Sequence, residues 1–101
     1  MKPVTMTRIV AQRRYSTATA TLLASDAWWD GHNWERSGRQ TWLYRTAAGS
    51  YFTVTVSQWS GERDVLEPCS IEDAQLLYEG SLSEHEVEYS EAFPDVVVAD
   101  A

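Results

Sequence analysis

The clearest pattern lies in the middle of the chain, where apolar and polar positions alternate with a period of two. Residues 50–58 read SYFTVTVSQ, which places Phe52, Val54 and Val56 on one side of an extended segment. Residues 41–46, TWLYRT, are also rich in β-branched and aromatic side chains, and the AAGS that follows supplies a glycine for a turn. The sequence therefore predicts an antiparallel hairpin of residues 41–46 and 50–58, whose apolar side faces the helices.

A helical period replaces this alternation in the last third of the chain. The short run VLEP at residues 65–68 first predicts a third strand, which ends at its proline. Ser70 then has the position of a helix N-cap with Asp73 three residues later, and Gly80 is placed to end the helix. Four apolar residues of this helix form one stripe: Ile71, Ala74, Leu77 and Tyr78.

The next segment, LSEHEVEYSEAFP, predicts a second C-terminal helix. Ser83 has the position of its N-cap, with Glu86 at the third helical position, and the helix is expected to end before Pro94. Three apolar residues can share one of its faces: Leu82, Tyr89 and Phe93. The final VVVADA adds an edge strand or remains loose.

The segment YSTATATLLAS predicts a short N-terminal helix, with Ser16 or Thr17 as its N-cap. Residues 1–14 form either a first strand or a poorly ordered arm. The expected fold is therefore α+β: a three-stranded antiparallel sheet, made of the hairpin and the short third strand, with one N-terminal and two C-terminal helices on one face. Residues 1–101 are expected to be a single domain, with residues 1–14 and 95–101 loose at its ends.

Composition supports a folded domain and limits its chemistry. Hydrophobic residues make up 44% of the chain, which is enough for one core. The single cysteine, Cys69, together with His32 and His85, has no metal-ligand spacing, and the five glycines form no phosphate-binding loop. We therefore expect no catalytic residue, no metal and no cofactor. The chain lacks an apolar run of about 20 residues and a signal-peptide pattern, so we expect a cytoplasmic protein.

The charge is distributed very unevenly along the chain. Residues 1–50 hold seven Lys or Arg and three Asp or Glu, whereas residues 51–101 hold one Arg and twelve acids. After Arg63 there are eleven acids and no basic residue. Such an asymmetry points to a partner with a basic surface, or it only keeps the protein solvated. The first interpretation predicts an acidic face on the C-terminal helices, formed by Glu79, Glu84, Glu88, Glu91 and Asp95.

An alternative binding surface lies in the basic half of the chain. Arginines beside exposed aromatic residues can grip a protein, a peptide or a single-stranded nucleic acid. The candidates all lie in the segment DAWWDGHNWERSGRQ, and we call them the Trp/Arg loop: Trp28, Trp29, Trp34, Arg36 and Arg39. The competing interpretation places the tryptophans in the core and pairs the arginines with the protein's own acidic helices. The net charge of −7 disfavours direct binding of nucleic acid.

Residues 15–94 also carry a resemblance to known proteins. The sequence LYRTAAGSYF, followed by EPCSIEDAQLLYE and EVEYSEAFP, resembles a loose group of small acidic proteins from phages and mobile elements. Proteins of this build are similar in size and charge to anti-CRISPR inhibitors. The resemblance implies a non-catalytic inhibitor in the cytoplasm of a bacterial host, which blocks a nucleic-acid-binding groove of a CRISPR effector subunit. It implies neither a membrane partner nor an oligomeric state.

Overall fold

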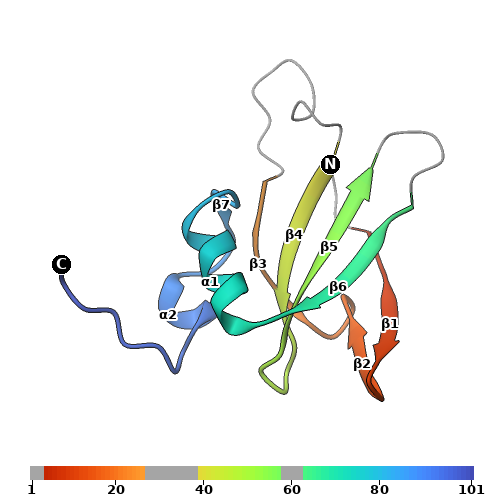
Figure 1. Cartoon of the computed structure of the whole chain (residues 1–101), viewed down its shortest axis with the longest axis horizontal. Helices are drawn as coiled ribbons and strands as arrows, with labels where there is room; N and C mark the ends of the chain where they lie inside the picture. Colours follow the sequence, from red (N-terminus) through yellow and green to blue (C-terminus); the bar gives the residue numbers. More distant parts are fainter. Residues whose placement is uncertain (1–3, 27–38, 58–62) are drawn as a thin grey trace.

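The computed structural model describes residues 4–26, 39–57 and 63–101. These residues form two antiparallel sheets and two short helices, so the protein is mostly β (Figure 1). The elements are β1 (Thr7–Val10), β2 (Arg13–Ser16), β3 (Thr21–Ser25), β4 (Arg39–Arg45), β5 (Tyr51–Ser57), β6 (Val65–Cys69), α1 (Ile71–Glu79), β7 (Glu84–His85) and α2 (Tyr89–Ala92). The predicted three-stranded sheet with three helices is therefore wrong. Within the described residues, neither helix is long and apolar enough to cross a membrane.

The larger sheet has five strands in the order β6-β5-β4-β3-β7. Its centre is the predicted hairpin of β4 and β5, in which Trp42 pairs with Val54 and Tyr44 with Phe52. Three hydrogen bonds close the turn between these strands, among them the 2.7 Å bond from Thr46 N to Ser50 O. Gly49 takes a positive φ of 92° there, which explains the glycine in AAGS.

One face of this sheet is covered by the hairpin of β1 and β2. Phe52, Val54 and Val56 are buried on this face in a cluster with Tyr15 of β2. The prediction that they face the helices is wrong, although their shared side and their burial are as expected. The sheet is buried on both faces, so an alternating pattern in β5 identifies one apolar face but not the layer that covers it.

The opposite face is covered by α1, α2 and the residues that join them. Here Leu23 and Leu43 of the sheet pack with Tyr78 of α1 and with Phe93. Leu23 and Ala24 both join this cluster because a β-bulge shifts the register between Leu22 and Ala24. The molecule therefore has three layers: helices, the five-stranded sheet, and the β1–β2 hairpin.

The β1–β2 hairpin is joined by a two-residue turn. Ala11 and Gln12 both have positive φ, at 51° and 65°, which is the conformation of the tight turns that suit twisted strands. Arg8 of β1 reaches the sheet, where its guanidinium donates a 2.7 Å hydrogen bond to the Leu66 carbonyl. This bond ties the hairpin to β6.

Helix α1 confirms the helix predicted after the third strand. The Ser70 side chain accepts a 3.1 Å hydrogen bond from Asp73 N, and Gly80 caps the C-terminal end. Ala74 and Tyr78 are the buried residues of the predicted apolar stripe. Because β6 and β7 are the two edges of the sheet, α1 carries the chain across the helical face from one edge to the other.

The predicted N-terminal helix is wrong, because its residues form the end of β2, a turn and β3. The Ser16 hydroxyl accepts a 3.2 Å hydrogen bond from Ala18 N, so it organises a turn instead of capping a helix. A turn and a helix N-cap use the same kind of hydrogen bond, in which a side-chain oxygen accepts from a nearby backbone N–H. The threonines that follow have low helix propensity and pack well in a strand.

The prediction of a second C-terminal helix that begins after Ser83 is also wrong, since only residues 89–92 of this segment are helical. Residues 84 and 85 form β7 and pair with Ser25 and Ala24 of β3. Helix α2 begins after Glu88, whose carbonyl accepts from Ala92 N at 2.9 Å. Ser83 is therefore not an N-cap, and residues 96–101 have no regular structure.

Candidate functional site

The structure places the predicted acidic face on several elements instead of one helix. Its five residues are all exposed: Glu79 ends α1, Glu84 is in β7, Glu88 precedes α2, Glu91 is in α2, and Asp95 follows it. The predicted helical spacing of Glu84, Glu88 and Glu91 is therefore absent. Of these three, only Glu91 lies within a helix.

The acidic residues nevertheless gather at one side of the molecule. Residues 71–95 contain eight Asp or Glu, all exposed, and no Lys or Arg. We call these eight the acidic layer: Glu72, Asp73, Glu79, Glu84, Glu86, Glu88, Glu91 and Asp95. They lie on or beside α1, β7 and α2, which Figure 1 shows together at one side of the molecule, whereas β1 and β2 lie at the other. The β1–β2 hairpin carries three exposed arginines and no acid.

Within the described parts of the chain, the arginines do not neutralise the acidic layer. The ion pair found there joins Arg8 to Glu67 of β6 at 3.9 Å, with both side chains about half exposed or more. Such a surface pair contributes about 0–1 kcal/mol. The interpretation that pairs arginines with the protein's own acidic helices is therefore not what the described residues show.

The Trp/Arg loop lies almost wholly outside the described residues. This holds for Trp28, Trp29, Trp34 and Arg36, while Arg39 is described only as the first residue of β4. The interpretation of the loop as a binding surface stays a prediction. Trp42, which follows the loop in β4, is a core residue with 2% of its surface exposed.

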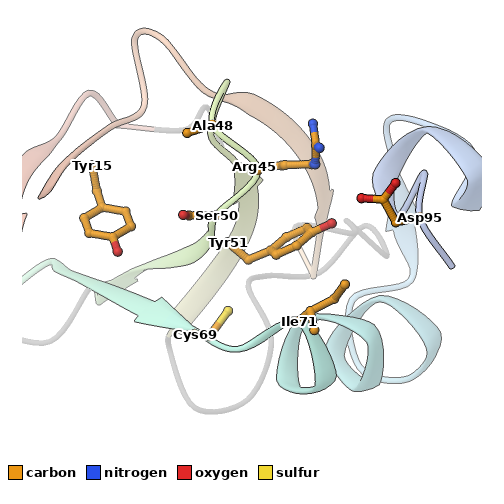
Figure 2. Close-up of a pocket in the computed structure, with 9 residues that line it drawn as sticks. Tyr15, Arg45, Ala48, Ser50, Tyr51, Cys69, Ile71 and Asp95 are labelled. Carbon is orange, nitrogen blue, oxygen red and sulfur yellow. The ribbon is translucent and has the colours of Figure 1, made fainter.

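The structure also shows a pocket at the end of the sheet, where all three layers meet (Figure 2). We call it the end pocket, and its volume is about 430 Å³. Tyr15 reaches it from β2, Arg45 and Tyr51 from the central hairpin, Cys69 from the end of β6, and Asp95 from the segment after α2. No sequence motif joins these five residues, because they come from four separate parts of the chain. Sequence reasoning singled out Cys69 and Asp95 but not the pocket.

The polar groups of Tyr51 and Arg45 in the end pocket differ in whether they have hydrogen-bond partners. The Tyr51 hydroxyl donates a 2.8 Å hydrogen bond to the buried Ala92 carbonyl, which fixes the ring. The Nε atom of Arg45 is buried and has no hydrogen-bond partner among the described residues. A buried donor without a partner is costly.

Cys69 is the candidate nucleophile of the end pocket, but its side chain stays a protonated thiol at neutral pH. Burial raises the pKa of Cys69 to about 11, and the negative charge of Asp73 adds to the rise. The reactive form of cysteine is the thiolate, which is therefore scarce at neutral pH. His85 cannot activate Cys69, because β6 and β7 are opposite edges of the sheet, about 19 Å apart at the usual strand spacing. His32 lies outside the described residues.

We expect Cys69 to react slowly with alkylating reagents. At a pH of about 8 the folded protein should react with iodoacetamide about a hundredfold more slowly than the unfolded chain, because its thiol pKa is higher. The rate should rise with pH until about 11, as the thiolate forms. Mass spectrometry measures this directly, since the chain has one cysteine. Equal rates for the folded and unfolded chains would show that the thiol is not protected.

His85 and Tyr78 form a second polar site beside the acidic layer. Their rings stack with centroids 3.8 Å apart, and His85 Nε2 lies 2.8 Å from the Tyr78 carbonyl oxygen. Tyr78 donates a 2.6 Å hydrogen bond to the Val87 carbonyl. These contacts hold the residues between β7 and α2 in place. Over the described ranges, no three His, Cys, Asp or Glu side chains are arranged to hold a metal ion.

Comparison of the chain with protein-family models, with curated proteins and with solved structures finds no match. The resemblance to small phage proteins therefore stays a prediction from the residues quoted for it.

Proposed function

We propose that this is a non-catalytic binding protein whose acidic layer docks on a positively charged surface of another protein. The observation that supports this most is that all eight acidic side chains of the layer are exposed and none forms an ion pair with a described cation. Uncompensated charge of one sign destabilises a compact protein through self-repulsion. The same charge attracts a basic partner, so the cost in stability is balanced by a gain in association.

The layered fold places the acidic layer and the arginines of the β1–β2 hairpin on opposite sides of the molecule. The three arginines of the β1–β2 hairpin lie on the far face of the sheet from the helices, so they do not screen the acidic layer. A molecule with opposite charges on opposite layers is oriented by a partner's electric field before contact. Such steering raises the association rate and makes it sensitive to salt.

The partner surface that fits best is a groove that normally binds nucleic acid. Such grooves carry lysines and arginines that contact phosphates, and exposed carboxylates can take the place of those phosphates. Together with the resemblance to phage proteins, this leads us to propose an inhibitor that competes with nucleic acid for a CRISPR effector subunit. The cytoplasm of a bacterial host is the corresponding compartment.

Changing Glu84, Glu88 and Glu91 together to Gln tests this proposal. The partner is first captured from a bacterial lysate at low salt and identified by mass spectrometry, and its affinity for each variant is then titrated over a range of salt concentrations. We expect the triple variant to bind about tenfold more weakly at low salt, with a shallower salt dependence. The three residues are exposed and are not stacked on one helix, so stability should change by no more than about 0.5 kcal/mol.

A matched control removes the same charge elsewhere. Asp64→Asn, Glu67→Gln and Asp100→Asn also neutralise three exposed acids, but these residues lie outside the acidic layer. The control should keep the parent affinity. Unchanged binding by the first triple variant, or equal losses in both, would contradict docking through the acidic layer. The partner's own nucleic acid should compete with the parent protein for binding.

A further inference from the structure

A second pocket opens beside the end pocket, on the side of the β1–β2 hairpin. We call it the hairpin pocket, and its volume is about 330 Å³. The lining residues are Arg13, Arg14, Tyr15, Thr19, Thr46, Ala47, Ala48 and Ser50. Tyr15, Ala48 and Ser50 also line the end pocket, so the two pockets are neighbours at the start of β5. Figure 2 shows these three shared residues on the side of the end pocket away from Asp95.

The lining of the hairpin pocket is chemically one-sided. Its residues include Arg13, Arg14 and three with aliphatic hydroxyls, Thr19, Thr46 and Ser50, but no acidic residue. Neither arginine forms an ion pair with a described residue. The Thr46 hydroxyl oxygen accepts the Ser50 N–H at 3.0 Å, which leaves its own proton for another acceptor. The pocket therefore offers positive charge and hydrogen-bond donors, a combination that suits an anion.

Both walls of the hairpin pocket are held by regular structure. The two-residue turn at Ala11 and Gln12 sets Arg13 opposite Val10 in the hairpin. Tyr15 anchors β2 to the sheet, because its ring packs edge-on against Phe52 with centroids 5.8 Å apart. On the other wall, backbone hydrogen bonds fix the turn that carries Thr46 and Ser50. The backbone that carries the donors is therefore already in place when a ligand binds, which lowers the entropy cost of binding.

We infer that the hairpin pocket binds the phosphate group of a small phosphate ester. A phosphate monoester carries nearly two negative charges and three acceptor oxygens, which match a pocket with arginines and hydroxyl-bearing residues in its lining. Arginine binds phosphate in a bidentate geometry that lysine cannot reproduce. The volume of each pocket lies within the range of small-molecule sites, which is about 300–1,000 Å³.

The charge of the whole chain favours a small ligand over a nucleic acid. The chain has a net charge of −7, so a long polyanion is repelled over its whole length, whereas a single phosphate group meets mainly the local arginines. The rest of the ester extends past Tyr15 and Ser50 into the end pocket. There it meets the Tyr51 ring. The phosphate site is separate from the acidic layer, of which only Asp95 lines the end pocket, and it goes beyond the proposed function.

Nuclear magnetic resonance titration of the full chain tests this inference. The probes are inorganic phosphate, adenosine monophosphate as a phosphate ester, adenosine without the phosphate, and a short single-stranded oligonucleotide. We expect phosphate and the ester to shift the backbone resonances of residues 13–15 and 46–50 in a saturable way, with the ester binding more tightly. Adenosine alone should leave them unchanged, and the oligonucleotide should bind no more tightly than the ester.

Variants then locate the site. The double change Arg13→Gln and Arg14→Gln should weaken ester binding at least about tenfold, because charge-assisted hydrogen bonds are lost. Arg63→Gln removes a charge outside the pocket, is compared with Arg13→Gln alone and should keep the parent affinity, and thermal melting confirms that all variants fold. The inference is overturned if neither phosphate nor the ester binds, or if the double variant binds the ester as tightly as Arg63→Gln. Tighter binding of the oligonucleotide through the same arginines would make the surface a nucleic-acid site and would also overturn it.

Discussion

Replacing Val54 with Asp is expected to unfold the domain. Val54 is 1% exposed in the centre of β5, where it belongs to the cluster between the sheet and the β1–β2 hairpin. A carboxyl group placed there finds no cation in the cluster, and burying it without partners costs at least about 4 kcal/mol. Domains of this size are stable by about 5–15 kcal/mol, so a loss of this size or more removes most or all of the stability of a domain near the lower end of that range. Circular dichroism during urea denaturation measures the effect.

Val65→Asp is the matched control for this change. Val65 pairs with Thr55 in the same sheet, but it lies in the edge strand β6 and is 39% exposed. The same substitution there should cost no more than about 1 kcal/mol. If Val54→Asp melted like the control, β5 would not lie between two packed layers, and the position of the β1–β2 hairpin would be wrong.

The second large effect is expected from Phe93→Ala. The Phe93 ring is fully buried and contacts three other rings, with centroid distances of 5.3 Å to Tyr51, 5.6 Å to Tyr78 and 4.9 Å to Tyr89. Its removal leaves a cavity beneath α1 and α2 and should lower the free energy of unfolding by about 3–5 kcal/mol. The same denaturation experiment measures this loss.

Leu76→Ala provides the comparison for Phe93. Leu76 is on α1 but is 69% exposed, so its truncation removes little packing and should cost less than about 1 kcal/mol. A loss at Phe93 no larger than the loss at Leu76 would mean that the segment after α2 does not pack on the sheet. The part of the acidic layer at α2 would then have no fixed geometry, because Glu91 and Asp95 lie within two residues of Phe93.

The parts of the fold that the sequence predicts correctly are those with local causes. The β4–β5 hairpin depends on alternation and on a glycine at positive φ, and both are visible within about a dozen residues. Helix α1 depends on Ser70, which caps it, and on Gly80, which ends it. These signals act between near neighbours in the chain, so they do not depend on the rest of the fold.

The incorrect predictions concern segments whose structure depends on distant residues. Residues 21–25 become β3 because β4 offers them a partner strand, and a bulge then buries Leu23 and Ala24 on the same face. Once β3 exists, its free edge pairs with Glu84 and His85, which shortens the predicted helix to four residues. Because β7 pairs with β3, missing the strand at residues 21–25 also meant missing the strand at residues 84 and 85. Tertiary pairing overrides a weak helical period, and its effect is not readable from either segment alone.

Among the candidate sites, too, one feature could be predicted from the sequence and another could not. Charge is a property of composition, so the acidic character of residues 71–95 could be predicted even though the helix assumed for Glu84 was wrong. The two pockets could not be predicted. Arg13 and Thr46 are 33 positions apart in the sequence, and only the packing of the β1–β2 hairpin on the sheet brings them to one pocket.

The hydrogen bond from Arg8 to Leu66 has a consequence for how copies of this protein meet in concentrated solution. An exposed edge strand such as β6 can template pairing with another chain and start aggregation. In β6, Leu66 and Pro68 have the same parity, so their backbone groups point to the same side of the strand. On that side the Leu66 carbonyl is already bonded to Arg8, and Pro68 has no N–H to donate. The edge therefore lacks the regular donors and acceptors that a strand of a second copy would need.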